Sequence, residues 1–311
     1  MEKEIEIEKV IGRIANRVET HMSVIYMSDD VVAKEIKPVD LGFVDLRSFE
    51  ARKAAAEKTA EIDRAYCPDL NSRVVLINGT PCIIMRRFDS SQGLDLLYDE
   101  GRVKTEYGKQ IGVMFAVAHK RAKTSTLISE IAYQSISRNW EELFFVTKEV
   151  ARAVGRTISE DDFHEIIEEI RFFVLDNDPY FQERRDKGVM RQCHGDGHAG
   201  NMFVEEGCVK IFDGIGFKDE FSYMDPVSDL AFAIMDAIAR GRTDIAEAIK
   251  SSYSEDKEGV ERLLKFYICY RAFVRGQIST MIAESVEEKE GILNTARKYY
   301  NLAVEYLPRR R

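Results

Sequence analysis

The sequence lacks the features that mark secreted, disulfide-rich and membrane-spanning proteins. Its five cysteines are scattered, odd in number and form no CxxC pair, so they predict neither a disulfide framework nor a zinc site. The first nine residues, MEKEIEIEK, are charged throughout, unlike a signal peptide. No apolar run approaches the roughly 18 residues of a membrane-spanning helix. We therefore expect a soluble cytoplasmic protein without a membrane partner, whose cysteines are small buried side chains in a reducing compartment.

An excess of basic residues is also missing. Lys and Arg number 45 against 54 Asp and Glu, which gives a formal net charge of −9. Because binding to nucleic acid relies on Lys and Arg that neutralise phosphates, we expect no nucleic-acid partner. What the composition does provide is 45% hydrophobic and 32% charged residues, as in ordinary globular proteins. A chain of 311 residues is long enough for one large or two modest domains, and it carries no signal for an oligomeric state.

A polar cluster in the second half of the chain carries the clearest chemical pattern. It reads His194-Gly195-Asp196-Gly197-His198 and is followed, five residues after Asp196, by Asn201. Residues 202–212 contain two apolar runs separated by Glu-Glu-Gly, which is typical of a tight turn. We predict that the two runs pair as a hairpin. The hairpin would bring Asn201 and the following Asp213 side by side at its open end.

These residues predict a magnesium site and a catalytic base. Carboxylate and amide oxygens are hard ligands that suit Mg²⁺, which usually takes one or two protein carboxylates plus substrate phosphates. In protein kinases an Asp before the hairpin accepts the proton of the substrate hydroxyl, while an Asn and a second Asp hold the metal. By this pattern Asp196 is the catalytic base, and Asn201 and Asp213 are the metal ligands.

Two other interpretations fit parts of the same motif. Gly, Asp and Asn are ordinary turn-forming residues, so Asn201 and Asp213 would in one case only cap a hairpin. In the other, His194, Asp196 and His198 alternate along a strand and face one way, as ligands of zinc in a metallohydrolase do. The glycines between them disfavour such a strand, and no further His lies nearby in the sequence.

The first 88 residues predict a small antiparallel sheet with one helix packed on it. Residues 1–20 are ambiguous, because apolar residues alternate with Glu in a segment whose charge density also suits a helix. Asn78-Gly79 is a strong hairpin signal, and Asp45 and Ser48 are both candidates to cap the helix. The predicted elements are strands over Ser23–Met27 and Val31–Ile36, a helix over 46–66, and strands over Arg73–Ile77 and Pro81–Phe88.

Lys34 is the natural candidate for binding a phosphate of ATP. In kinases such a lysine lies on the strand before the helix and pairs with a glutamate of that helix. Lys37 competes for the role, but it has the opposite strand parity and lies at the end of the strand. A solvated lysine at the sheet edge is the plain alternative. Three glutamates of the helix, at 50, 57 and 61, are candidates for the partner, and we select Glu57.

The nucleotide site lacks one familiar part. No GxGxxG loop precedes the candidate lysine, and Thr20–Ser23 are the candidates to cover the phosphates with their hydroxyl and amide groups. The base is expected where the strand that ends at Ile83-Ile84-Met85 leaves the sheet. There we predict Met85 behind the base, with backbone groups at the cleft from Arg86, Arg87 and Phe88.

The chain beyond residue 89 is predicted to be mainly helical, from apolar residues at helical spacing. One buried helix carries Arg271 and Arg275 on one face. Buried arginines need anionic partners, and we favour ion pairs with Asp225, Asp229 or Asp236 over binding of a phosphate or an acidic substrate. The expected helices cover residues 106–121, 163–173, 226–235, 263–278 and 286–306.

Six segments, in order from Thr20 to Gly276, resemble a known family. They are THMSVIY, VAKEIKPVDLGFVDL, NWEELF, CHGDGHAGN, IFDGIGFKDEFSYMDPVSDLAFAIMD and CYRAFVRG. Together they resemble aminoglycoside-phosphotransferase-like proteins, in a subgroup that often carries an appended P-loop ATPase domain. No P-loop signature occurs in this sequence, so we expect the free-standing kinase-like domain. The resemblance implies a protein-kinase-like fold, ATP, Mg²⁺ and transfer of phosphate to a small molecule.

Compared position by position with this family, the sequence retains the candidate base, metal ligands and lysine and differs at three other positions. Proteins of this kind usually have Leu where Gly197 stands, and Glu where Gly216 and Thr59 stand. These departures leave the base and metal ligands intact but put the lysine–glutamate pair in doubt. The roles that carry over by position are those of Asp196 as base, Asn201 and Asp213 as metal ligands, and Lys34 as ligand of the α- and β-phosphates.

We therefore expect an α+β, two-lobed fold, with a lobe of sheet and helix over residues 1–88. A larger, mainly helical lobe over 89–311 would carry the catalytic loop, the metal site and the acceptor site. The expected function is ATP- and Mg²⁺-dependent transfer of the γ-phosphate to a hydroxyl of a small molecule. A pseudokinase that binds nucleotide as a regulatory partner is the alternative. The retained base and metal ligands favour activity, and the missing glycine-rich loop favours the pseudokinase.

Overall fold

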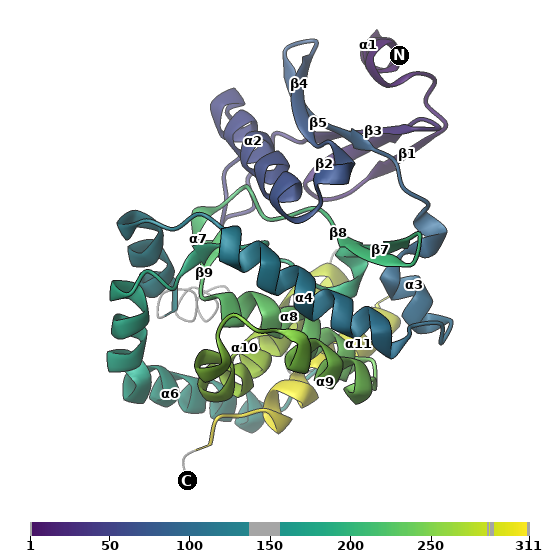
Figure 1. The fold of residues 1–311 in the computed structure, drawn as a ribbon. Coiled ribbons are helices and arrows are strands. Elements are labelled where there is room, and N and C mark those ends of the chain that lie inside the picture. The colour runs from purple at the N-terminus through teal and green to yellow at the C-terminus, as the bar shows by residue number, and fades with distance from the viewer. Residues whose placement is uncertain (1, 137–155, 285, 287–288, 310–311) are drawn as a thin grey trace. The chain divides into compact units, whose positions relative to one another are not determined.

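The computed structural model describes residues 2–136, 156–284, 286 and 289–309 (Figure 1). Its residues pack into two units. The first comprises Met1–Val103 and Cys193–Ser222, and the second comprises Lys104–Gln192 and Tyr223–Arg311. Packing therefore groups the motif around Asp196 with the N-terminal sheet. The lobe boundary that we expected at residue 88 stays a prediction.

The first unit is built on a five-stranded antiparallel sheet with strand order β1-β2-β3-β5-β4. Asn78 and Gly79 join the last two strands with φ values of 48° and 74°, the left-handed conformation of a two-residue hairpin turn. Four of these five strands and this hairpin were predicted from the sequence and are confirmed, although the last strand ends at Arg86 and not at Phe88. The strands are β1 (Asn16–Glu19), β2 (Ser23–Met27), β3 (Val31–Ile36), β4 (Arg73–Ile77) and β5 (Thr80–Arg86).

Helix α2 (Phe49–Tyr66) covers one face of this sheet (Figure 1). Ser48 is its N-cap, because the Ser48 hydroxyl accepts a hydrogen bond from the Ala51 amide at 3.1 Å. Small residues on the buried side of α2 let it approach the sheet closely. They are Ala55, Ala56 and Ala60, packed against Ile36, Ile83 and Met85.

A second helix, α1 (Glu2–Ile11), covers the opposite face, in a segment that the sequence had left open between strand and helix. Ile7 and Ile11 lie four residues apart, so they share one side of α1 and are buried against the sheet. The alternation of Ile and Glu had suited a strand equally well. A helix is favoured because it can pack its apolar side against the sheet, where β2, β3 and β5 present Tyr26, Ala33 and Ile84.

The remainder of the first unit holds the polar motif and its hairpin. Glu206 and Gly207 turn the chain with φ values of 52° and 78°, so the predicted Glu-Glu-Gly turn is confirmed. The elements are η1 (Pro68–Leu70), η2 (Ser90–Gln92), α3 (Leu94–Asp99), η3 (Ala199–Asn201), β7 (Met202–Glu205), β8 (Cys208–Ile211) and α7 (Asp219–Ser222).

The second unit is mainly helical. Gly108 and Gly112 allow α4 and α9 to approach each other closely, since a Cβ at Gly112 would lie 2.3 Å from the carbonyl oxygen of Ile249. The five helices expected from the sequence are present, while the NWEELF segment lies outside the described residues. The elements are α4 (Thr105–Arg121), α6 (Glu160–Asp186), β6 (Arg191–Gln192), β9 (Tyr223–Met224), α8 (Pro226–Ala239), α9 (Thr243–Ser252), α10 (Lys257–Glu284) and α11 (Glu290–Glu305).

The paired arginines of α10 lie against aromatic rings and a backbone carbonyl, and the ion pairs that we favoured stay a prediction. Arg271 donates to the carbonyl oxygen of Ser228 at 3.1 Å and lies over the ring of Phe232. The carboxylate of Asp225 is bound through both of its oxygens by Arg184, at 2.7 and 2.8 Å. Arg275 lies over the ring of Tyr299. Aromatic faces and a backbone carbonyl thus contribute negative potential around these arginines.

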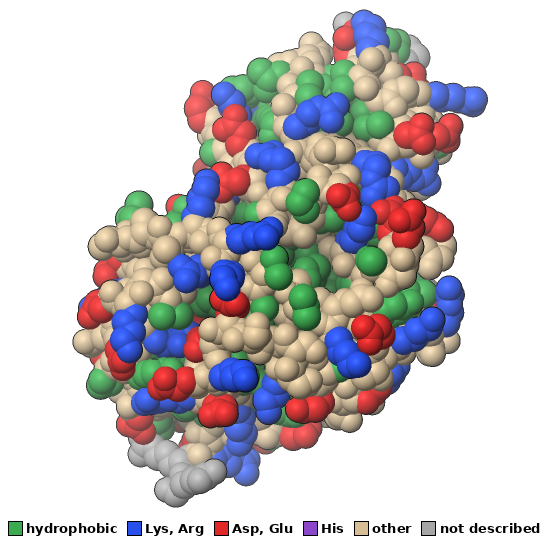
Figure 2. Space-filling view, viewed as in Figure 1, with side chains coloured by type: hydrophobic (Ala, Val, Ile, Leu, Met, Phe, Trp, Pro, Cys, Tyr) green, Lys and Arg blue, Asp and Glu red, His purple; other side chains and the backbone are tan. Residues whose placement is uncertain are grey.

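The α+β fold class predicted from the sequence is confirmed, with a small antiparallel sheet in one unit and a larger helical part in the other. Among the described helices, none combines the length and the apolar character needed to cross a membrane. Basic and acidic side chains are interspersed over the face shown in Figure 2.

Candidate functional site

The hairpin of β7 and β8 places the two predicted metal ligands. The amide of Phe212 donates to the carbonyl oxygen of Asn201 at 3.0 Å, so Asp213 follows directly on the residue that pairs with Asn201. The backbone of Asp213 has φ = 64°, a left-handed conformation that is unusual for a residue with a side chain. The predicted hairpin geometry is confirmed, and it includes a strained backbone position at the candidate metal ligand.

Asp196 and Asn201 form one hydrogen-bonded pair. The side-chain amide nitrogen of Asn201 donates to the backbone oxygen of Asp196 at 2.9 Å and to its carboxylate Oδ2 at 2.8 Å. Both bonds use the nitrogen of the amide, so Oδ1 is the Asn201 atom that can bind a cation. The same contact fixes the carboxylate of Asp196.

The two histidines of the motif are held by the backbone. His194 Nε2 lies 3.0 Å from the carbonyl oxygen of Phe212, which can only accept, so Nε2 carries the proton. His198 Nδ1 accepts from the amide of Gly200 at 3.0 Å, which places the proton on Nε2, 3.4 Å from Asp196 Oδ2. A zinc ligand would need a lone pair on the nitrogen that faces the metal. The arrangement therefore disfavours the metallohydrolase interpretation.

Lys34 extends from β3 to Asp213 and forms an ion pair with it. Its side chain is only 17% exposed. Lys37 instead bonds to Glu19 at 3.0 Å and to the carbonyl oxygen of Thr20 at 3.1 Å, near the edge of the sheet. The opposite strand parity of the two lysines thus separates them as expected. The structure brings Lys34, and not Lys37, to the candidate metal ligand.

Glu57 does not pair with Lys34, so this expectation is wrong. Its side chain is 56% exposed and lies 3.8 Å from Lys53, one turn earlier on α2. The buried side of α2 includes Thr59 and Asp63, and Glu57 is on the outward side of the helix. Sequence spacing alone could not choose between the helix glutamates, because it does not fix the rotation of α2 about its axis.

Asp63 is a residue of the site that sequence reasoning missed. It is fully buried and accepts hydrogen bonds from the amide of Gly214 at 3.2 Å and from the Ser72 hydroxyl at 3.1 Å. Burial raises the pKa of the Asp63 carboxyl, and the negative charge of Asp213 raises it further. A usable signal was present, since Asp63 continues the apolar stripe of Ala56 and Ala60 at helical spacing.

The residues proposed for the nucleotide base connect the sheet to the hairpin. Met85 is buried, and Phe88 stacks on Phe203 with ring centroids 4.0 Å apart. The amide of Arg87 donates to the carbonyl oxygen of Asp30 at 2.8 Å. That amide is thus already bonded within the sheet. Arg86 contributes its side chain to an ion-pair network rather than to a ligand site.

This network joins the end of β5 to β7 and η1. Arg86 binds both carboxylate oxygens of Glu205 at 2.8 Å, and Lys210 lies 2.9 Å from Glu205 and 2.7 Å from Asp69. Arg86 and then Lys210 lower the pKa of Glu205 to about 2. Because the guanidinium of Arg86 contacts both oxygens of Glu205, the contact fixes the orientation of the two side chains and holds the hairpin against the end of β5.

The turn proposed to cover phosphates is closed on itself. The amide of Thr20 donates to the carbonyl oxygen of Ser23 at 2.8 Å, and the Thr20 hydroxyl accepts from the Ser23 amide at 2.9 Å. These groups are therefore used to join β1 to β2. A role in binding phosphate stays a prediction for this turn.

The donors of the site fit Mg²⁺ in chemical kind. Asn201 offers an amide oxygen and Asp213 a carboxylate, both hard oxygen ligands. Two protein ligands suit a cation that keeps several waters and takes others from phosphates. Lys34 supplies a positive charge at Asp213.

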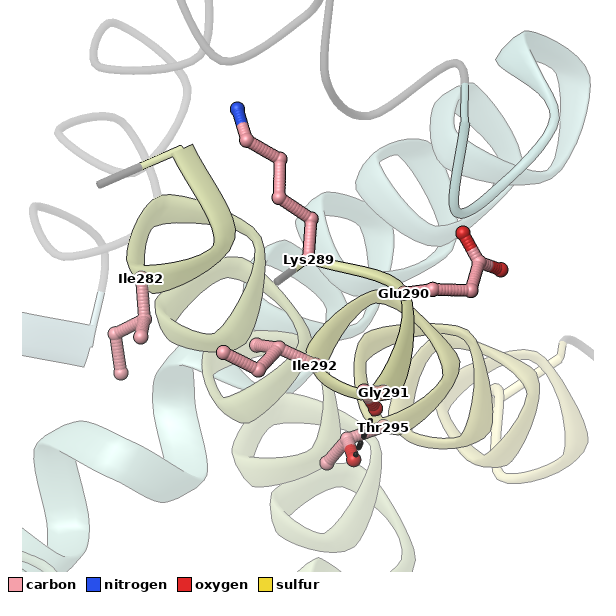
Figure 3. A pocket seen from close by; sticks show the side chains of 6 residues that line it. All are labelled: Ile282, Lys289, Glu290, Gly291, Ile292 and Thr295. Carbon is pink, nitrogen blue, oxygen red and sulfur yellow. Dashed lines mark hydrogen bonds between the residues drawn. The ribbon is translucent and has the colours of Figure 1, made fainter. Parts of the chain in front are cut away.

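A pocket in the second unit contains none of these residues. It has a volume of about 650 Å³ and is lined by the end of α10 and the start of α11 (Figure 3). Its polar side chains are Lys289, Glu290 and Thr295, and the Thr295 hydroxyl is bonded to the carbonyl oxygen of Gly291. These groups do not form a recognisable catalytic set.

Comparison with known proteins identifies relatives of unknown function. No protein-family model matches the sequence. Uncharacterized protein Rv2004c of Mycobacterium tuberculosis is 26% identical over 269 residues, which cover 84% of this chain and 53% of that protein. Uncharacterized protein Mb2027c of Mycobacterium bovis matches to the same extent. This chain therefore spans about half the length of the curated relatives that it matches.

Solved structures with a similar fold include phosphotransferases. Aminoglycoside phosphotransferase APH(2'')-Ib with bound ADP has a TM-score of 0.54 and 14% identity, over 98% of both chains. Aminoglycoside 2'-phosphotransferase-IIIa in complex with GDP has a TM-score of 0.52 and 11% identity, over 98% of both chains. Choline kinase of Cryptosporidium parvum has a TM-score of 0.51 and 9% identity, over 94% of this chain and 88% of its own. The chain thus has the kinase-like fold of aminoglycoside phosphotransferases, as its sequence had suggested.

Proposed function

We propose that this chain, which has the fold of aminoglycoside phosphotransferases, transfers the γ-phosphate of ATP to a hydroxyl of a small molecule with the help of Mg²⁺. The observation that carries the proposal is one set of contacts. Asn201 holds Asp196, the backbone of Asn201 pairs with the residue before Asp213, and Asp213 binds Lys34. The similar folds named above include complexes with ADP and GDP, which supports a nucleotide as one substrate.

In this proposal Mg²⁺ is held by Asn201 through Oδ1 and by Asp213 through its carboxylate. Bound Mg²⁺ would neutralise charge on the phosphates, which is the main task of catalysis in phosphoryl transfer. Lys34 adds a second positive charge for the α- and β-phosphates. Its ion pair with Asp213 keeps it inside the site before nucleotide binds.

Asp196 acts as the base that orients the acceptor hydroxyl and takes its proton. Asn201 and the Nε2–H of His198 both face Oδ2 of Asp196, so the carboxylate has a fixed direction. A fixed base contributes more than a mobile one, because the reacting groups then need little reorganisation. The γ-phosphate moves to the acceptor oxygen, the O–H proton moves to Asp196, and ADP leaves.

In this proposal the nucleotide base would lie against Met85 and the backbone of residues 86–88. The amide of Arg87 is bonded to Asp30, so recognition of the base would rely on the other backbone groups of this segment. The ion pair of Arg86 with Glu205 and the stacking of Phe88 on Phe203 hold the segment rigid.

Turnover of ATP with a panel of small hydroxyl compounds, with and without Mg²⁺, tests the proposal. Amino alcohols belong in the panel, because the named folds include kinases of aminoglycosides and choline. We expect phosphorylated product only with Mg²⁺. Asp213→Ala should abolish the Mg²⁺-dependent part of ATP binding in calorimetry.

Two results would contradict the proposal. Equal affinity of wild type and Asp213→Ala for ATP with Mg²⁺ present would reject the metal site. Binding of ATP without turnover of any acceptor, and without effect of Asp196→Asn, would favour a nucleotide-binding regulatory protein.

A further inference from the structure

We propose that Asp63 is a positioning residue, which holds the backbone after Asp213 against helix α2 and thereby fixes the carboxylate that would bind the metal. The inference rests on the proposed function for the role of the metal. Asp63 is fully buried, and each of its two oxygens accepts one hydrogen bond, Oδ1 from the Gly214 amide and Oδ2 from the Ser72 hydroxyl. The helix acid of this site therefore binds the backbone of the metal-ligand segment, while Lys34 pairs directly with Asp213.

The backbone of residues 214–216 lies directly on α2. A Cβ at Gly214 would lie 2.2 Å from Cγ2 of Ile62, and a Cβ at Gly216 would lie 2.3 Å from the backbone nitrogen of Thr59. No side chain fits at either position unless α2 or the segment shifts. Gly216 and Thr59, noted separately in the sequence as departures from similar proteins, are thus in contact.

Further contacts fasten the rest of the segment. The amide of Ile215 donates to the carbonyl oxygen of His194 at 2.9 Å. Asp219 forms an ion pair with Lys58 of α2. Phe43, in the loop before α2, lies 6.4 Å from Phe217 and 6.1 Å from Phe221, measured between ring centroids. The segment after the metal ligand is therefore attached to α2 and its preceding loop along its length.

The bond from Gly214 to Asp63 matters because of the conformation of Asp213. A left-handed backbone is unfavourable for a residue with a side chain, and it persists only where the surroundings impose it. The peptide groups on both sides of Asp213 are held, by His194 Nε2 through the Phe212 carbonyl and by Asp63 through the Gly214 amide. Without Asp63 one of these two restraints is lost, and Asp213 can relax away from its direction in the site.

Two substitutions of similar size separate the hydrogen bond from the charge. Asp63→Asn removes the charge, but its amide oxygen can still accept from Gly214 and its nitrogen can donate to the Ser72 hydroxyl. Asp63→Leu also removes the charge and offers no acceptor. Asp63→Ala replaces the leucine variant if that variant does not fold, since it removes the same acceptor without adding bulk. Ser72→Ala serves as the control that leaves the bond to Gly214 in place.

The first readout is hydrogen–deuterium exchange in the protein without nucleotide or metal. We expect exchange in the peptide that contains residues 213–216 to be roughly five- to tenfold faster in Asp63→Leu than in wild type, as loss of one hydrogen bond predicts. Asp63→Asn and Ser72→Ala should stay within about twofold of wild type, and peptides of β4 and β5 should be unchanged. Equal exchange of this peptide in the Leu and Asn variants would overturn the inference, whether or not the protein binds nucleotide.

The second readout is the affinity for ATP with and without Mg²⁺. We expect Asp63→Leu to lose about tenfold or more of the affinity that depends on Mg²⁺, with unchanged affinity in its absence, and Asp63→Asn to behave like wild type. Equal loss with and without Mg²⁺, or no loss, would overturn the role towards the metal. If wild type binds no ATP, the proposed function fails, and the exchange experiment alone decides whether Asp63 holds the segment.

Discussion

The two faces of the five-stranded sheet use charge in different ways. Lys34 and Glu35 are neighbours on β3 and point to opposite faces. Glu35 is buried on the α1 side and pairs with Lys3, among apolar residues of the core between α1 and the sheet. Lys34 lies on the α2 side and pairs with Asp213. Asp213 is close enough to Asp63 to raise its pKa, and it follows the residue that pairs with Asn201.

The difference shows that an ion pair alone does not identify a site. Both pairs join a β3 residue to a segment outside the sheet, and both are partly buried. The pair of Glu35 has an apolar neighbourhood, whereas the pair of Lys34 has further carboxylate and amide groups around a strained backbone. Changes on the α2 face should therefore affect catalysis, and changes on the α1 face should affect stability.

The largest effect is expected at the proposed base. Asp196→Asn should reduce kcat at least about a hundredfold and leave the affinity for ATP unchanged, because Asn is nearly isosteric but cannot take the proton. Steady-state kinetics with an accepted substrate and calorimetry of ATP binding measure the two quantities. Asp69→Asn, an exposed acid that pairs with Lys210, is the control and should stay within about twofold of wild type. Full turnover in Asp196→Asn would mean that another group is the base.

The next largest effect is expected for Lys34 on β3, and Lys37 just after the strand provides the contrast. Lys34→Met should weaken ATP binding roughly 10- to 100-fold, because a charge-assisted hydrogen bond to phosphate contributes about 1.5–3 kcal/mol. Lys37→Met and Glu57→Ala should leave ATP affinity within about twofold, since Lys37 pairs with Glu19 and Glu57 is exposed. Calorimetry of ATP binding to the three variants measures the contrast. A larger loss in Lys37→Met than in Lys34→Met would reverse the assignment.

The α1 face should respond in stability and not in activity. Ile7 is fully buried, so Ile7→Ala should reduce the free energy of unfolding by about 2–4 kcal/mol. Ile5 on the same helix is 51% exposed, so Ile5→Ala should cost less than about 0.5 kcal/mol. Urea unfolding measures both, and kcat of the folded protein should be unchanged in each. A fall in kcat without loss of stability in Ile7→Ala would contradict the claim that the α1 face affects only stability.

The smallest effect concerns the ion-pair network at Glu205. Its pKa is lowered in the folded protein to about 2, so this group stabilises the fold above its ordinary pKa near 4.5. That contribution is lost as the pH falls from about 4.5 to about 2. Glu205→Gln should therefore be less stable than wild type at pH 6, and the difference should shrink as the pH is lowered towards 3. Urea unfolding across this range tests it, and a difference independent of pH would contradict the prediction.

Local signals in the sequence were sufficient for most elements. Asn78-Gly79 specified a hairpin because both residues tolerate a positive φ. Ser48 was one of two candidate caps, and its hydroxyl accepts from a free amide at the start of the helix. The first helix could not be predicted with the same certainty. Its alternating Ile and Glu fit two periods, and only contact with the sheet decides between them.

In the candidate site, too, some residues follow from local sequence signals and others only from tertiary contacts. Asp196, Asn201 and Asp213 were accessible to sequence reasoning because a short hairpin fixes their spacing. Glu57 was a wrong choice, and Asp63 was missed, because the rotation of α2 depends on how its alanines pack against β5. The hydrogen bond of Asp63 to Gly214 joins residues 151 positions apart, so no local sequence pattern indicates it.

By itself the sequence determined four strands of the sheet, most helices, the hairpin and the residues on it that carry the proposed chemistry, because turns, caps and periodicity act within a few residues. Only the tertiary structure decided that α1 covers the outer face, that Glu57 points away from Lys34, and that Asp63 holds Gly214. These outcomes depend on the close packing of side chains from distant segments. Such packing selects one rotation and one partner among several that local spacing allows.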